Sequence, residues 1–261
     1  MTPSRMDDSK IEAAVEEFEA ARARGKYFPR AWFDRLSLDD AYRILLALVG
    51  RRSGAEGCRI GWKIGLTAPA IQQQFGVHEP VFACLLADGL AQSGHVFCRD
   101  ALIEPGFENE LCIVFDRDLP ANATRADVAA AVAPVHPAFE IIETRGDLTG
   151  QLALALSDNG QQKAFVLGEP VSREELPELD MVTVRVRIND TEVATASGDA
   201  VLGHPYNSVA WLASKLTHFG ERLSAGDYIM SGSFTRQFPL ARGDRIEAVF
   251  DGIGAVTASV V

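Results

Sequence analysis

The chain has 261 residues, of which 47% are hydrophobic and 23% are charged, and its formal net charge is −11. These are the proportions of an ordinary globular protein with one large domain or two small ones, and the negative charge argues against nucleic acid or an anionic membrane as a partner. No apolar run approaches the roughly 20 residues that span a bilayer, and the N-terminal stretch lacks a signal-peptide core, so we expect a cytoplasmic protein.

The N-terminal part of the chain predicts two helices. Ser9 is a candidate N-cap for a helix over about residues 10–24, which has an apolar stripe and an acidic face. Ser37 begins a second helix, with Asp40 three residues later in an arrangement that resembles a capping box. Nothing in these helices suggests chemistry, so we interpret them as structural.

Residues 59–67 alternate with the period of a strand. Lys63 shares one face with Gly61 and Gly65, and two flanking glycines leave space in which a ligand can approach the backbone. The alternative is a lysine that lies along the surface with its ammonium group in water. The residues alone do not favour either reading.

The next segments predict short elements. Residues 85–97 are apolar with glycine punctuation, which indicates β structure with a hairpin at Ser93–Gly94. A helix is expected to begin at Thr124 or Asp127 and to be broken by Pro134.

The most informative stretch is 105–115, which reads as a buried strand from Leu111 onward. Glu108 and Glu110 are two residues apart, so both side chains lie on one face, with Cα atoms about 6.5–7 Å apart. Two buried carboxylates at that distance repel each other, and a divalent cation such as Mg2+ or Mn2+ would remove the repulsion. The alternative is a solvated strand face at a sheet edge.

A second apolar strand, at residues 138–143, also contains an acid, Glu140. A carboxylate inside such a strand needs a partner. It could be a third ligand of the cation held by Glu108 and Glu110, in an oxygen-rich octahedral site with open positions. Pairing with Arg145 is the competing interpretation.

The C-terminal half predicts a polar loop at 157–161, a β-hairpin with its turn at Asn189–Asp190, and a helix over 207–219 that His204 precedes as an entry residue. Further strands are expected at residues 165–168, 228–233, 245–250 and 255–260. Helices followed by many strands with inserted helices predict the α+β class.

The four cysteines show no CxxC pair and no zinc-ligand spacing. We expect thiols that are not in disulfides and are mostly buried, in a reducing compartment. A catalytic role for Cys112, beside the glutamate pair, is the less favoured alternative.

From about Leu36 to its end, the chain resembles the 2-oxopent-4-enoate hydratases and 4-oxalocrotonate decarboxylases of the fumarylacetoacetate hydrolase superfamily. The order and spacing of the matching segments are specific, although each segment is weak alone. The segments are Gly61-Trp62-Lys63-Ile64-Gly65-Leu66-Thr67, Phe107-Glu108-Asn109-Glu110, Pro137-Ala138-Phe139-Glu140-Ile141, Asp158-Asn159, Gly203-His204-Pro205, Ala210-Trp211-Leu212-Ala213, Ala225-Gly226-Asp227 and Gly243-Asp244.

The resemblance implies a mixed β-roll of the fumarylacetoacetate hydrolase C-terminal type with peripheral helices. We expect one domain over 1–261, in which residues 1–57 form an N-terminal helical segment and residues 58–261 form the catalytic β-roll. The implied site consists of Glu108, Glu110 and Glu140 as ligands of Mg2+ or Mn2+, Lys63 as the catalytic lysine, and Gly65, Gln161 and Ser233 as substrate-binding residues.

The implied function is a metal-dependent hydratase that adds water to a short acid of the 2-hydroxypenta-2,4-dienoate type in the degradation of aromatic compounds. A decarboxylase of a 4-oxalocrotonate-like 2-oxo-enedioate is the alternative, as is a non-catalytic subunit that associates with a related lyase. The resemblance also implies a homo-oligomer whose partner is a small 2-oxo acid substrate. A C–C bond hydrolase is less favoured because the His–Glu pair of such relatives is not found.

The chain departs from the family pattern at several positions. Val81 stands where the hydratases usually have Asp, and Gln161 stands where a serine is usual. Ala83 replaces a glycine, and the family's Asp-Ser-Arg is Glu-Thr-Arg at 143–145. The metal ligands therefore match better than the acid–base groups, and His78 or Glu79 is a possible substitute for the missing acid.

Overall fold

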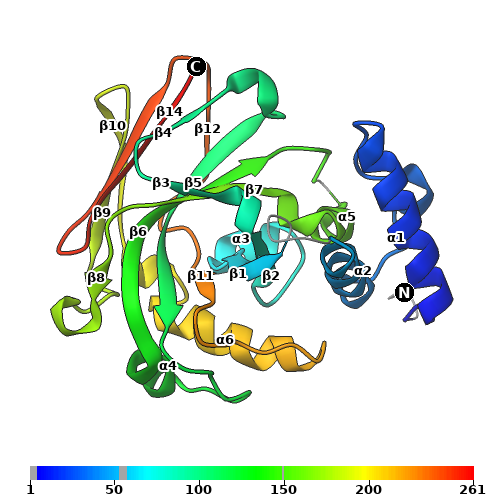
Figure 1. The fold of residues 1–261 in the computed structure, drawn as a ribbon, viewed down its shortest axis with the longest axis horizontal. Coiled ribbons are helices and arrows are strands. Elements are labelled where there is room, and N and C mark those ends of the chain that lie inside the picture. The colour runs from blue at the N-terminus through cyan, green and yellow to red at the C-terminus, as the bar shows by residue number, and fades with distance from the viewer. Residues whose placement is uncertain (1–4, 53–57, 149) are drawn as a thin grey trace.

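The structure is a computed structural model that describes residues 5–52, 58–148 and 150–261. Two sheets are joined along one core, and α1 and α2 lie beside them next to α5 (Figure 1). The helices are α1 (Asp8–Ala23), α2 (Leu38–Gly50), α3 (Pro69–Gln74), α4 (Arg125–Ala131), α5 (Leu152–Ser157) and α6 (Pro205–Thr217). None of the described helices is long and apolar enough to cross a membrane.

The larger sheet has nine strands in the order β2-β1-β11-β5-β6-β7-β3, with β12 pairing β5 and β8 pairing β6. The strands are β1 (Arg59–Gly65), β2 (Val81–Leu86), β3 (Leu90–Gln92), β5 (Pro105–Phe115), β6 (Val132–Glu143), β7 (Gln162–Leu167), β8 (Val171–Ser172), β11 (Tyr228–Met230) and β12 (Phe238–Pro239). The two longest strands, β5 and β6, are antiparallel neighbours near its middle. The predicted α+β class with a mixed, rolled sheet is confirmed.

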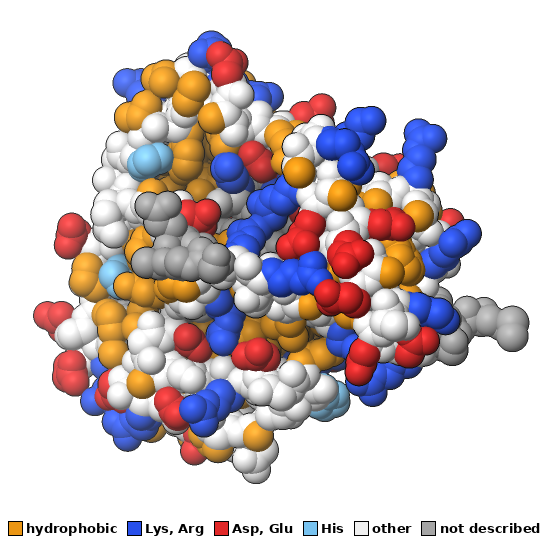
Figure 2. All heavy atoms as spheres, turned by 45° about the vertical axis from the view of Figure 1, so that its right-hand side comes forward, with side chains coloured by type: hydrophobic (Ala, Val, Ile, Leu, Met, Phe, Trp, Pro, Cys, Tyr) orange, Lys and Arg blue, Asp and Glu red, His pale blue; other side chains and the backbone are white. Residues whose placement is uncertain are grey.

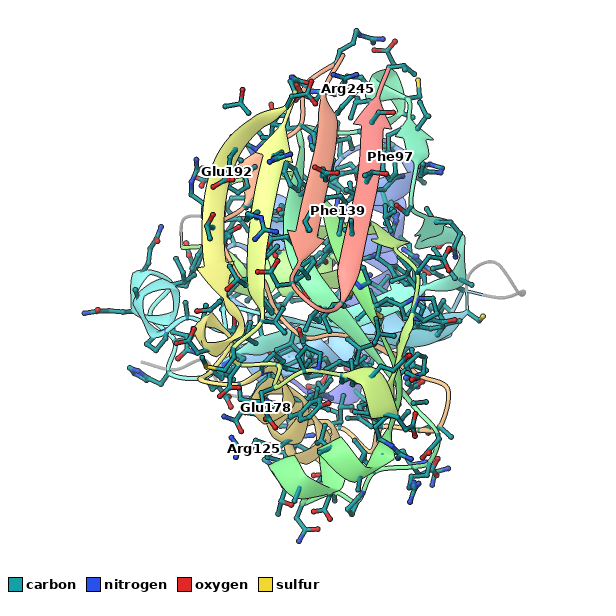
Figure 3. All side chains as sticks on the ribbon, turned by 90° about the vertical axis from the view of Figure 1, so that its left-hand side faces the viewer. Phe97, Arg125, Phe139, Glu178, Glu192 and Arg245 are labelled. Atoms are coloured by element: carbon teal, nitrogen blue, oxygen red, sulfur yellow. The ribbon has the colours of Figure 1, made fainter. Side chains whose placement is uncertain are left out.

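The smaller sheet has five strands in the order β10-β9-β13-β14-β4, and Figure 3 shows it face on. The strands are β4 (His95–Phe97), β9 (Thr183–Ile188), β10 (Thr191–Ser197), β13 (Arg245–Phe250) and β14 (Gly254–Val260). The predicted hairpin of β9 and β10 is confirmed. Asn189 and Asp190 have φ of 51° and 68°, the left-handed pair that a tight two-residue turn needs.

The hairpin predicted at Ser93–Gly94 is wrong. β3 pairs with β7 in the larger sheet, whereas β4 pairs with β14 in the smaller one. The Ser93 amide donates to Leu167 and the Gly94 amide to Thr257, so the chain crosses between the sheets at this point. A local turn signal cannot reveal this, because both pairing partners lie far along the chain.

Two further boundaries differ from the prediction. The side chain that caps α1 belongs to Asp7, which accepts from the Lys10 amide, and Ser9 lies inside the first turn. α4 ends at Ala131, before Pro134, and β6 follows directly and includes that proline. The Ser37 cap of α2 is confirmed.

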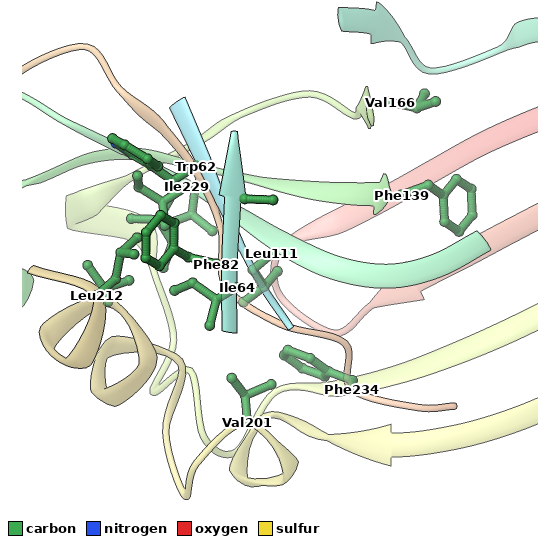
Figure 4. Packing of buried hydrophobic residues seen from close by; sticks show 14 of the residues in the cluster. Trp62, Ile64, Phe82, Leu111, Phe139, Val166, Val201, Leu212, Ile229 and Phe234 are labelled. Carbon is green, nitrogen blue, oxygen red and sulfur yellow. The ribbon is translucent and has the colours of Figure 1, made fainter. Parts of the chain in front are cut away.

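The main core lies between the larger sheet and the helices around it. Figure 4 shows Trp62, Phe82 and Ile229 on neighbouring strands, with Leu212 of α6 close by. The Tyr42 ring of α2 stacks on Phe82 with 4.1 Å between ring centroids, so α2 packs directly on the β structure. The division at residue 57 into a helical segment and a β-roll stays a prediction.

A second cluster contains Ile11 of α1, Ile44 of α2 and Leu154 of α5. The N-terminal helices thus hold α5 in place, and α5 is one wall of the cavity described below.

On the face shown in Figure 2, acidic and basic side chains alternate with apolar ones, and no broad basic area is seen.

Gly61 tests the packing of β1 on β11. A Cβ at this position would overlap the carbonyl group of Tyr228, whereas a Cβ on Gly50 at the end of α2 would meet nothing within 4 Å. We expect Gly61→Ala to lower the free energy of unfolding by about 3 kcal/mol. Gly50→Ala should leave it unchanged or raise it by up to about 1 kcal/mol. Urea unfolding of both variants is the measurement, and equal stabilities would contradict the packing described.

Candidate metal centre and adjoining cavity

Three glutamates meet where β5 and β6 pair. The antiparallel register places Glu108 directly opposite Glu140, and Glu110 lies on the same face of β5 two residues on. Each offers a carboxylate oxygen, and these oxygens all lie within 4.8 Å of one another. The structure therefore brings together all three residues that the sequence predicts as metal ligands.

These carboxylates are buried without enough partners. Glu110 and Glu140 are fully buried. The Gly232 amide donates to Glu110 Oε2 at 2.7 Å. Among the described residues, Glu110 Oε1 and Glu140 Oε2 have no partner, and Glu140 Oε1 has only the Lys63 ammonium group at 3.3 Å. Buried acceptors rarely stay unsatisfied, and hard divalent cations take oxygen ligands of this kind.

Burial and mutual repulsion raise the pKa values of these glutamates. Burial, with the Glu140 charge adding to it, raises the pKa of Glu108 to about 7. Burial and the charges of Glu140 and Glu108 raise the pKa of Glu110 well above its usual value. A cation between the carboxylates would reverse both effects. The donor set thus fits an oxygen-ligated divalent ion.

Lys63 lies beside the glutamates. Its Nζ is 3.3 Å from Glu140 Oε1, and the side chain is only 9% exposed, so the surface-lysine alternative is wrong. Burial alone would lower the pKa of Lys63, but the carboxylates of Glu140, Glu108 and Glu110 outweigh it and raise the pKa. The ammonium form is therefore stabilised by the site.

The predicted open space around Lys63 is present on one side only. Gly65 lines a cavity, but Gly61 is covered by the backbone of β11. The role of Gly61 is close strand packing.

A cavity of about 290 Å3 opens from the glutamates. Its lining includes Lys63, Glu108 and the three residues expected to bind substrate, Gly65, Gln161 and Ser233. This volume lies at the small end of the range for ligand sites. The sequence reasoning missed Arg236 and Gln237, which also line the cavity; their only signal was their place just after Ser233.

The segment 157–161, predicted as a polar loop, is largely buried: Ser157 ends α5, and Asn159–Gln161 forms a short 3-10 turn. Asn159, Gly160 and Gln161 all have φ between 56° and 62°, a left-handed turn that is costly for residues with side chains. The Asn159 side chain holds the turn, because it accepts from the Cys84 amide at 2.9 Å and donates to the Cys84 carbonyl at 3.0 Å. This turn places Gly160 against Lys63 and leaves Gln161 Nε2 buried with no partner among the described residues.

Arg145 does not pair with Glu140, so the competing interpretation of that strand is wrong. Its guanidinium lies 3.1 Å from Glu143 and also binds the Asp158 carboxylate and carbonyl. The arginine therefore ties β6 to the start of the left-handed turn.

The proposed substitute acids lie elsewhere. Glu79 accepts from Trp211 and Lys215 of α6, and neither His78 nor Glu79 lines the cavity. Burial raises the pKa of the Cys112 thiol far above its usual value, which excludes a ready thiolate there. Cys84 is buried as well, but Cys58 and Cys98 are exposed, so half of the thiols are buried rather than most.

A second group of possible ligands comprises Glu178, Asp180 and His204. Figure 3 shows Glu178 near Arg125, below the smaller sheet. His204 Nδ1 accepts from the Tyr206 amide at 3.0 Å as the N-cap of α6, which confirms its predicted entry role. The neutral ring then carries its proton on Nε2, so the remaining nitrogen has no lone pair for a metal.

Comparisons with known proteins agree with this geometry. Residues 74–261 match the fumarylacetoacetate (FAA) hydrolase C-terminal family. A 2-keto-4-pentenoate hydratase of Dechloromonas aromatica is 34% identical over 254 residues, or 95% of each chain. A 2-oxo-hept-4-ene-1,7-dioate hydratase of Escherichia coli is 32% identical and covers 97% of this chain and 96% of its own. The 4-oxalocrotonate decarboxylase of Pseudomonas putida G7, solved with magnesium and adipate, superposes with a TM-score of 0.89 at 31% identity, over 98% of this chain and 99% of its own.

Metal binding can be tested without activity. Saturating Mn2+ or Mg2+ should raise the melting temperature by about 5–10 °C, the shift expected at about 100-fold excess over Kd. Glu110→Gln should melt near the wild type in chelator, since Glu110 is readily protonated there, but should lose the metal-dependent rise. The exposed Glu192→Gln is the matched control and should keep it. An undiminished rise in Glu110→Gln would contradict the ligand assignment.

The buried Arg145 network predicts a stability effect. Arg145→Met leaves Glu143 and Asp158 buried without their cation, and we expect a loss of about 3–5 kcal/mol in the free energy of unfolding. Arg185→Met removes an exposed pair with Asp251 and should change stability little. Thermal or urea unfolding distinguishes the two, and a mild effect of Arg145→Met would show that the network is not structural.

Proposed function

The chain belongs to the fumarylacetoacetate hydrolase C-terminal family, and from that premise we propose that it is a metal-dependent hydratase, a carbon–oxygen lyase. It adds water to a short 2-oxo or 2-hydroxy-dienoic acid of the 2-hydroxypenta-2,4-dienoate type, in the degradation of aromatic compounds. The hydratase names of its relatives support the reaction class. The observation that carries the proposal is the group of three glutamates, two of them fully buried and short of partners, beside a metabolite-sized cavity that Glu108 lines.

We propose that Glu108, Glu110 and Glu140 hold Mg2+ or Mn2+. The bound cation would supply a Lewis acid for the carboxylate and 2-oxo end of the substrate. The side chains that line the cavity would bind and orient the substrate and transfer protons.

Lys63 is the candidate catalytic residue. Its ammonium group is held beside Glu140, where it can stabilise negative charge that develops on the substrate and exchange a proton with it. Among the described residues that line the cavity, the titratable groups are Lys63, Glu108 and Arg236. Since Glu108 is a proposed ligand and an arginine keeps its proton, proton transfer falls to Lys63 and to water.

In the proposed hydration, the oxygen of water bonds to one carbon of the remote double bond and a proton goes to the carbon chain. Gly65, Gln161 and Ser233 would bind and orient the substrate, since all three line the cavity. The apolar walls from α3 and α5 restrict how water reaches the reacting carbons.

A decarboxylase on the same scaffold is the second candidate. Val81 places an apolar side chain at the cavity where the hydratases usually have Asp, and the decarboxylase of P. putida G7 has closely similar structure. Loss of CO2 would use the same metal-bound end of the substrate. We also propose that the protein forms a homo-oligomer in solution, which the molar mass from light scattering would test. A further proposal is that it is a non-catalytic subunit that associates with a related lyase, and light scattering of the mixture would detect that complex.

The direct test is the ultraviolet absorbance of 2-hydroxypenta-2,4-dienoate mixed with the protein and Mg2+, then with excess chelator. We expect metal-dependent loss of the dienol band and a 4-hydroxy-2-oxo acid as product. If the band persists, a 2-oxo-enedioate with CO2 detection decides for or against the decarboxylase.

Substitutions of Glu108 and Lys63 test the roles proposed for these two residues. Glu108→Ala should abolish turnover in a folded protein, and Lys63→Met should lower kcat by about 10²–10⁴ while Mn2+ still raises the melting temperature. Glu192→Ala is the exposed control. Retained turnover in Glu108→Ala would overturn the metal assignment.

A further inference from the structure

The cavity has two ends with different chemistry. At the end that we call closed, Glu108 lines the cavity and belongs to the cluster with the fully buried Glu110 and Glu140. Arg236, an exposed residue between β11 and β12, also lines the cavity, and we call its end the open end. The closed end suits a metal and the 2-oxo acid group. The proposed reaction does not determine which group of the substrate binds at the open end.

Arg236 has no carboxylate partner in the described parts of the chain. Its guanidinium lies 4.3 Å from the centre of the Phe238 ring, and Nη1 donates only a long bond, 3.4 Å, to the Gln237 carbonyl. Stacking on Phe238 orients the plane of the guanidinium and leaves most of its five N–H donors available. A planar fork of this kind matches a carboxylate in a bidentate manner.

The charges within the cavity do not cancel at this end. Once a divalent cation is bound, it and Lys63 together balance the three glutamates. Among the residues that the structure describes, Glu108 is the only carboxylate that lines the cavity, and it belongs to the closed end. Arg236 is therefore the cavity's unbalanced charge.

Apolar side chains line much of the rest of the cavity. Ile71 and Phe75 come from α3 and its end, Leu152 and Leu156 from α5, and Val81 from β2. Such walls suit a hydrocarbon chain. A divalent cation bound at one end, an unpaired arginine at the other and apolar walls between them would match an unbranched diacid, which carries a carboxylate at each end.

Resting on the proposed function, we propose that this site selects 2-oxo acids that carry a second carboxylate at the far end, and that Arg236 binds that carboxylate. The ion pair also bears on the reaction. A carboxylate that leaves as CO2 gives up its charge, so an arginine bound to it stabilises the ground state and opposes its loss. Arg236 therefore favours hydration of a diacid over its decarboxylation.

Unreactive saturated 2-oxo acids test this, because the partners in each pair differ only at the far end. Calorimetry with Mg2+ compares 2-oxoglutarate with 2-oxopentanoate, 2-oxoadipate with 2-oxohexanoate, and 2-oxopimelate with 2-oxoheptanoate. At one chain length or more, we expect the diacid to bind about tenfold more tightly, a modest factor because Arg236 is partly solvated.

Arg236→Gln should bind the two members of each pair alike, and Arg236→Lys should keep part of the preference. Arg242→Gln, which removes a surface arginine paired with Asp100 outside the cavity, should keep all of it. Equal binding of both members by the wild-type protein, or a preference that survives in Arg236→Gln, would overturn the inference.

The same binding measurements distinguish a failure of the role proposed for Arg236 from a failure of the proposed function. Mg2+-dependent binding of both classes without preference leaves the metal site standing and removes the role of Arg236. If no 2-oxo acid binds in an Mg2+-dependent way, the proposed function itself fails and this inference fails with it. Incubation with an unsaturated 2-oxo diacid adds a readout of the reaction: a product heavier by one water supports the inference, and released CO2 contradicts it.

Discussion

The close approach of three carboxylates in the interior of a sheet is the constraint on which this structure depends. Left alone, Glu108, Glu110 and Glu140 repel one another in a medium that screens charge poorly, and burial raises their pKa values. They stay together because β5 and β6 pair over almost their whole length and have neighbours on both sides, β11 and β7. A site that opposes its own formation needs a rigid support, and two long central strands provide one.

Lys63 offsets part of this repulsion, and its place depends on β1. The close approach of β1 to β11 requires Gly61, and the left-handed turn at 159–161 packs on the lysine from the other side. That turn is in turn fixed by the bonds of Asn159 to β2 and by Arg145 on Asp158. Residues that do not line the cavity thus determine the position of Lys63, which does.

How much could be predicted follows from the range of each interaction. The spacing of Glu108 and Glu110 shows that they share a face, and the Ser37 cap and the Asn189–Asp190 turn are local, so the sequence sufficed for them. That Glu140 lies opposite Glu108 depends on strand register, so the residues alone left Glu140 with two candidate partners, the cation and Arg145. The family resemblance favoured the cation. The false hairpin at Ser93–Gly94 and the true partners of Arg145 have the same cause, since the groups that decide them lie elsewhere in the fold.

Two of the departures from the family pattern, Val81 and Gln161, line the cavity. Val81 removes an acid and Gln161 replaces a hydroxyl with a larger amide, so the cavity loses a group that could exchange a proton and gains donors. Arg236 cannot take over proton transfer, because its guanidinium does not titrate in this range. With the proposed cation bound and Lys63 exchanging the proton, such a cavity would suit a reaction in which the metal end of the substrate takes up the developing charge. The remaining task of the protein would then be to hold the far end of the substrate in place.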